Sequence, residues 1–169
     1  MPPHNVSANV QMLQTFVPDT HIPPMRPFLF TDELPVEGQI AYEVNILQRS
    51  EGYRSSFVYN PENNKYYRYV EGSPYVDKYS GEHISFSNVI VQRTRTSYYN
   101  GESNRPVTEN VGSGNADIFI GGRYIPGYWI RTGTYDRTIF FDQYGNELKL
   151  LRGTTFICMF SSKHEVNFR

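Results

Sequence analysis

The clearest pattern in the chain is an alternation of apolar and polar residues from 112 to 129. The alternation is interrupted at the pair Gly121–Gly122 and resumes with aromatic residues that end at Trp129, the only tryptophan. A period of two is typical of a strand with one buried face, and a glycine pair supplies the backbone angles of a tight turn. The segment therefore predicts a β-hairpin, in which the stretch 112–114 lies close to the Trp129 end.

The same period of two recurs along most of the remaining chain, where it predicts further strands. They are expected over residues 40–47, 53–59, 65–70, 88–95, 138–141, 147–151 and 154–160. Turn residues separate them, as at 60–64, 77–81 and 142–146. The 14 tyrosines and 11 phenylalanines also favour half-buried strand surfaces. Short strands with frequent turns predict a mainly β fold, either an antiparallel β-sandwich or a partly open barrel.

Only the start of the chain has a helical pattern. Apolar residues recur at every third position from Val10 to Phe16, which predicts one short N-terminal helix over residues 7–16 with Ser7 as its cap. Five prolines follow between residues 18 and 38. They indicate an extended connector between this helix and the strands.

The charge and the apolar content of the chain limit the kinds of partner that it is expected to bind. The chain has 16 Lys and Arg against 17 Asp and Glu, a net charge of -1, so no overall positive charge attracts nucleic acid or an anionic membrane. No stretch approaches the roughly 20 apolar residues of a membrane span, and the first residues lack the pattern of a signal peptide. We therefore expect no nucleic-acid partner and no direct insertion of this chain into a membrane.

The single cysteine is the candidate nucleophile. Cys158 is flanked by Ile157 and Met159, so a buried structural thiol is its expected role. The alternative is a strand-end thiolate that resembles the sortase transpeptidases, and it would need a histidine or arginine nearby. The four histidines are scattered without the spacing of metal ligands. We expect no catalytic residue, no metal site and no cofactor.

The hairpin provides the best candidates for ligand binding, because it combines an open glycine backbone with polar groups and aromatic rings. The candidate ligand-binding residues are Ser113, Asn115, Arg123, Tyr124 and Trp129. A structural explanation competes with this one: a tight turn at 112–114 and Trp129 in the core. Arg93 and Arg95 share one face of a predicted strand and would form an anion site if they converge with other arginines.

Several blocks of sequence resemble a known family in their order and spacing. The blocks are Pro3-His4-Asn5, Asn88–Gln92, Gly112-Ser113-Gly114-x-Ala116, Gly127-x-Trp129 and Thr138–Ile157. They are similar to the carboxy-terminal domain of the YerB-type lipoproteins of Gram-positive bacteria, a family without an established biochemical activity. The resemblance implies that residues 1–25 are the remnant of a missing N-terminal domain, and that residues 26–169 form an all-β C-terminal domain.

The resemblance also implies an extracytoplasmic protein that is anchored at the membrane in its full-length form. We expect a domain that binds a ligand or partner, such as a glycan or peptide of the cell envelope. Two alternatives stay open: a cell-envelope enzyme with its site at the loop 112–115, and a purely structural interaction domain. We also expect association, either as a homo-oligomer or by docking of the missing N-terminal domain, to which the apolar residues 28–30 would contribute.

Overall fold

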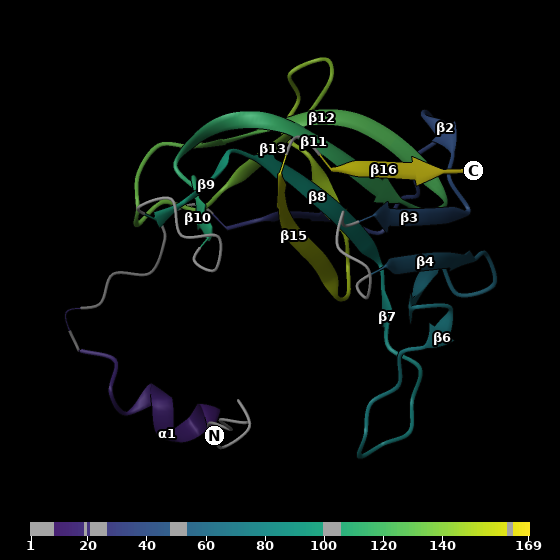
Figure 1. Ribbon diagram of the computed structural model, residues 1–169, viewed down its shortest axis with the longest axis horizontal. Coiled ribbons are helices and arrows are strands. Elements are labelled where there is room, and N and C mark those ends of the chain that lie inside the picture. The colour runs from purple at the N-terminus through teal and green to yellow at the C-terminus, as the bar shows by residue number, and fades with distance from the viewer. Residues whose placement is uncertain (1–8, 19, 21–26, 48–53, 100–105, 162–163) are drawn as a thin grey trace.

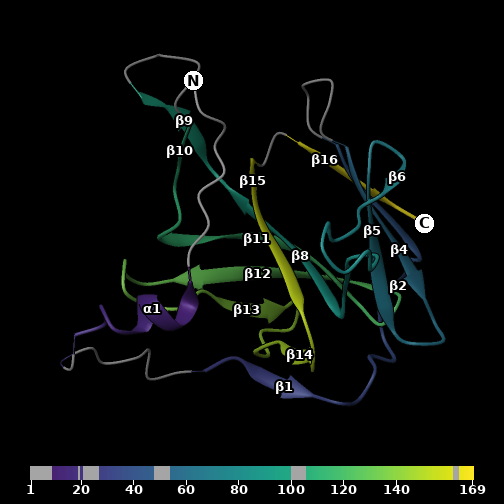
Figure 2. The same cartoon turned by 90° about the horizontal axis from the view of Figure 1, so that it is seen from below.

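Among the described residues, two six-stranded β-sheets make up most of the structure, and two smaller strand pairs and one short α-helix accompany them (Figures 1 and 2). The computed structural model describes residues 9–18, 20, 27–47, 54–99, 106–161 and 164–169. The expected mainly β fold with one short N-terminal helix is confirmed. Among the described residues the two large sheets pack face to face as a sandwich, and neither closes into a barrel.

The first sheet carries the predicted hairpin at its centre. Its strand order is β13–β12–β11–β8–β15, and β2 pairs with β12 outside this path. The strands are β2 (Gln39–Ile40), β8 (Asn88–Thr94), β11 (Gly112–Ile120), β12 (Arg123–Arg131), β13 (Ile139–Asp142) and β15 (Thr155–Ser161). Neighbouring strands are antiparallel except β8 and β15, which run parallel.

The second sheet is antiparallel throughout, with the order β16–β3–β4–β5–β6 and with β7 paired to β5. Its strands are β3 (Glu43–Leu47), β4 (Ser55–Asn60), β5 (Lys65–Val70), β6 (Ser73–Pro74), β7 (Ser85–Phe86) and β16 (Glu165–Phe168). The smaller pairs are β1 (Leu29–Thr31) with β14 (Lys149–Leu151), and β9 (Thr96–Tyr98) with β10 (Pro106–Thr108).

The core consists of two clusters, one on each face of the first sheet. The inner cluster lies between the sheets, where Val89 and Phe119 of the first sheet pack with Phe57 of the second. The outer cluster lies on the opposite face and includes Ile90 and Trp129. Because successive side chains of a strand point to opposite faces, the central strand β8 supplies apolar residues to both clusters.

The β11–β12 hairpin turns at Gly121 and Gly122, as predicted. Both glycines have positive φ angles, 58° and 73°, which are the angles of a type I′ turn. The ladder then runs from Ile120↔Arg123 to Gly112↔Arg131. The stretch 112–115 is therefore the first part of β11, and the expectation of a turn or loop there is wrong.

The strand predicted over residues 40–47 is broken at Ala41 and Tyr42. The N–H of Ala41 donates to the carbonyl of Gly122 in the first sheet (2.8 Å), whereas the N–H of Tyr42 donates to the carbonyl of Arg169 beside the second (2.7 Å). The chain thus crosses from one sheet to the other at this point. The apolar–polar alternation over residues 40–47 is continuous, but hydrogen bonds to two different sheets divide the segment into two strands.

The helix is shorter than predicted and has a different cap. Helix α1 spans Val10–Gln14, and the side chain of Asn9 accepts hydrogen bonds from the N–H groups of Gln11 and Met12. Ser7 lies outside the described residues. Helix α1 buries none of its side chains and lies apart from the sheets (Figure 1).

The apolar residues 28–30 dock in part against the body of the protein. Phe28 packs against the outer cluster, and the guanidinium of Arg137 lies 4.5 Å from the centre of its ring. Leu29 and Phe30 stay largely exposed, although their strand β1 pairs with β14. The division of the chain at residue 25 falls outside the described residues and stays a prediction, as does the association of the chain.

Candidate functional site

The candidate site is a break in the ladder between β8 and β11. The ladder pairs end at Gln92↔Ala116. The two segments meet again where the N–H of Glu109 donates to the carbonyl of Arg95 at 3.0 Å. From there β9 and β10 continue as a pair that projects beyond the first sheet (Figure 2).

The two sides of this break are unequal in length. The β8 side contributes only residues 93–94, whereas the β11 side contributes residues 110–115. The longer side must bow outward, as a strand does at a β-bulge. Gly112 has a φ of 124°, and a side chain at this position would be strained. The glycine therefore permits the bend at the start of β11.

A groove of about 650 Å³ opens at the break, and we call it the β8–β11 groove. It is lined by Arg93, Thr94, Arg95, Glu109, Val111, Gly112, Ser113, Gly114, Asn115, Asp117 and Trp129. Arg95, Glu109, Ser113 and Asn115 are exposed. No ion pair among the described residues holds Arg95 or Glu109. The groove therefore offers both signs of charge to a ligand.

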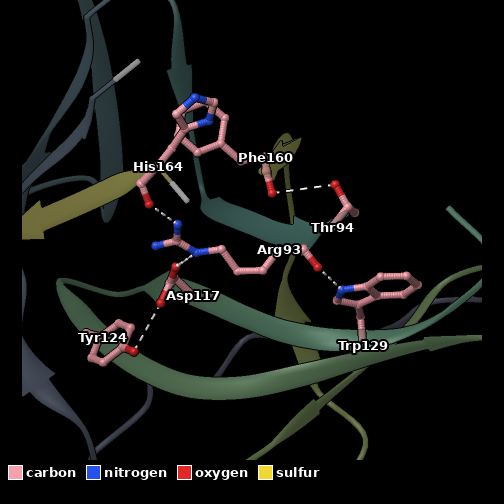
Figure 3. Close-up of polar contacts among 7 residues, drawn as sticks. All are labelled: Arg93, Thr94, Asp117, Tyr124, Trp129, Phe160 and His164. Atoms are coloured by element: carbon pink, nitrogen blue, oxygen red, sulfur yellow. Dashed lines mark hydrogen bonds and ion pairs between the residues drawn. The ribbon is translucent and has the colours of Figure 1, made fainter. Parts of the chain in front are cut away.

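Figure 3 shows a network of polar contacts around two lining residues of the groove, Arg93 and Asp117. Arg93 donates from Nε to Asp117 Oδ2 at 2.6 Å and from a terminal nitrogen to the carbonyl of His164. The hydroxyl of Tyr124 donates to Asp117 Oδ1 at 3.2 Å. The side chains of Arg93 and Asp117 are only 17% and 19% exposed. Both oxygens of the carboxylate are thus engaged, and the arginine is fixed in place.

Tyr124 keeps its proton in this network. Burial raises its pKa to about 12, and the nearby carboxylate of Asp117 contributes in the same direction. The hydroxyl is therefore a hydrogen-bond donor at neutral pH. It donates to Asp117 and does not act as a proton acceptor.

Trp129 lies against Gly114 and ties β12 to β8. Its indole N–H donates to the carbonyl of Arg93 at 2.8 Å, and the residue is 2% exposed (Figure 3). A Cβ atom at Gly114 would lie 2.6 Å from that same carbonyl oxygen and 2.8 Å from the indole nitrogen. Only glycine leaves room for this crossing. Trp129 belongs to the outer core cluster, although it also lines the groove.

The structure brings three of the five predicted ligand-binding residues together and separates the other two. Ser113, Asn115 and Trp129 line the groove. Arg123 lies at the turn end of the hairpin, where it donates to the carbonyl of Gly38 at 3.1 Å. Tyr124 also lies at that end and reaches the site only through Asp117. Antiparallel pairing places positions near the turn far from the open end, so one cluster of all five is not formed.

Two lining residues, Asp117 and Glu109, were not predicted from the sequence. The period of two places 113, 115 and 117 on one face of β11, so this signal could have identified Asp117. Arg93 and Arg95, considered above for an anion site, both line the groove. Neither Arg54 nor Arg68 lines the groove, and Arg68 lies in β5 of the second sheet. Arg49 lies outside the described residues. Glu109 was not detectable, because only the break in the ladder makes it a lining residue.

Cys158 packs against the inner core cluster and is partly buried. Burial raises the pKa of its thiol to about 12, although Arg93 and Arg68 oppose this effect. The thiol is protonated at neutral pH, which opposes a role as a thiolate nucleophile. No three His, Cys, Asp or Glu side chains gather into a possible metal site in the described part of the chain. No helix there is long and apolar enough to span a membrane.

Comparison with known proteins identifies the family of this domain. Residues 43–157 match the model described as "Protein of unknown function (DUF3048) C-terminal domain". The chain belongs to this family. The crystal structure of the YerB protein from Bacillus subtilis is similar, with a TM-score of 0.67 and 16% sequence identity over 83% of this chain and 47% of YerB. No curated protein matches the chain.

The likeness to YerB confirms the expected YerB-type fold. At 16% identity it establishes the fold alone. The chain spans about half the length of YerB, because the match covers 47% of that protein. The DUF3048 family is one of unknown function, so any function has to be argued from the groove.

Proposed function

We propose that this DUF3048 domain is a ligand-binding module and that the β8–β11 groove is its binding site. The observation that carries the proposal is the break in the ladder, which opens a polar groove of about 650 Å³ beside exposed charged side chains. Ligand sites are concave and contain a few polar groups that converge on one volume. An extracytoplasmic location and a cell-envelope glycan or peptide as the ligand are part of the proposal. Their support is the resemblance to the YerB-type lipoproteins.

The state of the polar groups supports binding over catalysis. Asp117 has both oxygens engaged by Arg93 and Tyr124, so it is not poised to accept a proton from a substrate. The thiol of Cys158 has a raised pKa of about 12 and packs in the core. The groups that remain exposed, such as Ser113 and Asn115, are suited to hydrogen bonding with a ligand.

A second cavity is a weaker candidate. It has a volume of about 470 Å³ and lies between residues 35–38 and the turn that contains Asp142. The Oδ1 atom of Asp142 accepts hydrogen bonds from the N–H groups of Tyr144 and Asn146 within its own turn. These bonds serve to form the turn. The β8–β11 groove is favoured because it presents charges of both signs, Arg95 and Glu109, which no ion pair among the described residues holds.

The proposal is tested by titration with soluble peptidoglycan fragments that carry both glycan and peptide. Binding should shift the amide NMR signals of Gly112 and Gly114 and change the fluorescence of Trp129, the only tryptophan. The variant Asn115→Tyr, which fills the groove, should abolish both changes. Asn167→Tyr is the matched control, because Asn167 is also an exposed strand residue but lies in the second sheet.

The test of the proposal depends on which residues show NMR shifts on titration, and not only on whether shifts occur. If the fragments leave Gly112, Gly114 and Trp129 unchanged, the groove is not their binding site. If Asn115→Tyr binds as the wild type does, the ligand occupies another surface. Either result contradicts the proposal.

A further inference from the structure

We infer that the β8–β11 groove accepts an extended peptide with a free carboxylate, rather than a glycan. The inference rests on the proposed binding function and narrows its ligand to one class. Three features of the groove carry it: the unpaired strand segments at its rim, the charge at one end and the lack of an exposed aromatic ring.

The rim of the groove contains strand backbone without a ladder partner on one side. β11 pairs with β12 along Gly112–Asn115, but no ladder pair joins these four residues to β8. In an antiparallel strand, alternate residues direct their N–H and C=O groups to opposite edges. Part of the backbone of Gly112–Asn115 therefore faces away from β12. An extended peptide can pair with such an edge as an added strand.

The charged groups of the groove define its polarity. Arg95 and Glu109 lie at the β9–β10 end, where a backbone hydrogen bond of 3.0 Å joins them. Arg93 is already paired with Asp117, so among the lining residues that the structure describes Arg95 is the guanidinium that remains for a ligand. A guanidinium binds a carboxylate with two parallel hydrogen bonds. The neighbouring carboxylate of Glu109 disfavours a ligand with many negative charges, which selects a single carboxylate.

The aromatic content of the groove argues against a sugar. Among the described residues that line it, Trp129 is the only aromatic one, and it is 2% exposed with its N–H already bonded to Arg93. No ring face of the lining residues is open for stacking on a sugar ring. Tyr124, the other predicted aromatic contact, lies at the far end of the hairpin. The polar side chains and strand backbone that remain match the groups of a peptide.

The experiment compares probes that differ in one group at a time, with the amide NMR shifts of Gly112 and Gly114 as the readout. The probes are tetra-alanine with free termini, its C-terminal amide, its backbone N-methylated form and the N-acetylglucosamine tetramer. Four residues match the length of Gly112–Asn115 at about 3.3 Å per residue. Tetra-alanine should bind best. Amidation and N-methylation should each weaken binding by about tenfold, because each removes a hydrogen-bonding group of the peptide.

Variants assign the carboxylate to its partner. Arg95→Gln should weaken the binding of free tetra-alanine by about tenfold and make the amide bind equally well. Arg54→Gln is the matched control, because Arg54 is exposed and does not line the groove. Circular dichroism of each variant verifies that the fold is retained.

The possible failures are distinguishable. If the sugar tetramer shifts Gly112 and Gly114 and tetra-alanine does not, the inference is wrong while the proposed binding function stands. If amidation or Arg95→Gln leaves the affinity unchanged, Arg95 does not hold a carboxylate and the inference is overturned. If the peptide, the sugar and the peptidoglycan fragments all leave these glycines unchanged, the binding function fails as well.

Discussion

The two ends of the β11–β12 hairpin differ in what surrounds them. At the turn end, the centre of the Tyr124 ring lies 5.3 Å from the centre of the Phe119 ring and 4.4 Å from that of the Phe168 ring. A Cβ atom at Gly122 would lie 2.8 Å from the ring of Tyr59. At the open end, a Cβ atom at Gly112 would have no neighbour within 4 Å. The turn end is enclosed by core residues, whereas the open end has one core residue, Trp129, and an exposed edge that borders the groove.

This difference shows that a strand pattern alone does not define a site. Both ends have aromatic, polar and glycine residues in alternation, and both contributed predicted ligand contacts. Packing against the second sheet occupies Tyr124 at the turn end. The break between β8 and β11 leaves Ser113 and Asn115 exposed at the open end. Asp117 connects the two ends, since it is bonded to Tyr124 and also lines the groove.

The largest expected change in the free energy of unfolding is at Trp129. This residue lines the groove, but we expect its role to be structural. Trp129→Ala should lower the free energy of unfolding by about 3–5 kcal/mol, because it empties a buried site and leaves the carbonyl of Arg93 without its donor. Urea unfolding followed by circular dichroism measures this change. Ser113→Ala, at an exposed neighbouring position, should change it by less than about 0.5 kcal/mol. Equal effects of the two variants would contradict the division between core and groove.

A smaller effect is expected at the carboxylate that joins the two ends. Asp117→Asn should lower the free energy of unfolding by about 2–3 kcal/mol, because it leaves the mostly buried charge of Arg93 without its partner. Asp32→Asn provides the control. Its ion pair with Arg152 has side chains that are 76% and 66% exposed, so we expect less than about 0.5 kcal/mol. Urea unfolding of both variants under the same conditions decides the comparison. A similar loss in both would show that burial does not distinguish the two pairs.

The smallest effect concerns Tyr124 and appears at alkaline pH. Its pKa of about 12 in the folded protein exceeds the ordinary value of 10.0, so the folded state retains a proton that the unfolded state loses. The stability from this group is full below pH 10 and decreases as the pH rises toward 12. Tyr124→Phe should lower stability by about 1 kcal/mol at pH 7. It should also reduce the alkaline loss measured by urea unfolding, and an unchanged pH profile would assign that loss to other groups.

Much of the fold was predictable because its determinants are local. Alternation identified the strand 65–70 at its observed bounds, and positive φ angles occur at Gly81 and Gly145 in two of the predicted turns. Within the predicted strand 88–95, Val89 and Ile90 pack on opposite faces, as a period of two requires. Each of these features depends on neighbouring residues and on the backbone preference of glycine.

The candidate site was predictable only in part. Ser113, Asn115 and Trp129 were expected together because hairpin pairing brings the start of one strand beside the end of the next. Arg123 and Tyr124 were expected beside them but lie at the turn end. Position along a hairpin, rather than closeness in sequence, decides which side chains share a surface.

The sequence by itself determined the mainly β class, the hairpin at Gly121–Gly122 and the faces of its strands. These follow from a period of two and from glycines that adopt positive φ, and both act over a few residues. Only the tertiary structure decided that the β8–β11 ladder breaks after Gln92↔Ala116 and that residues 40–47 divide between two sheets. Both outcomes depend on hydrogen bonds between segments that are distant in sequence. Such pairings compete with local preference, and their result is decided by the packing of the whole domain.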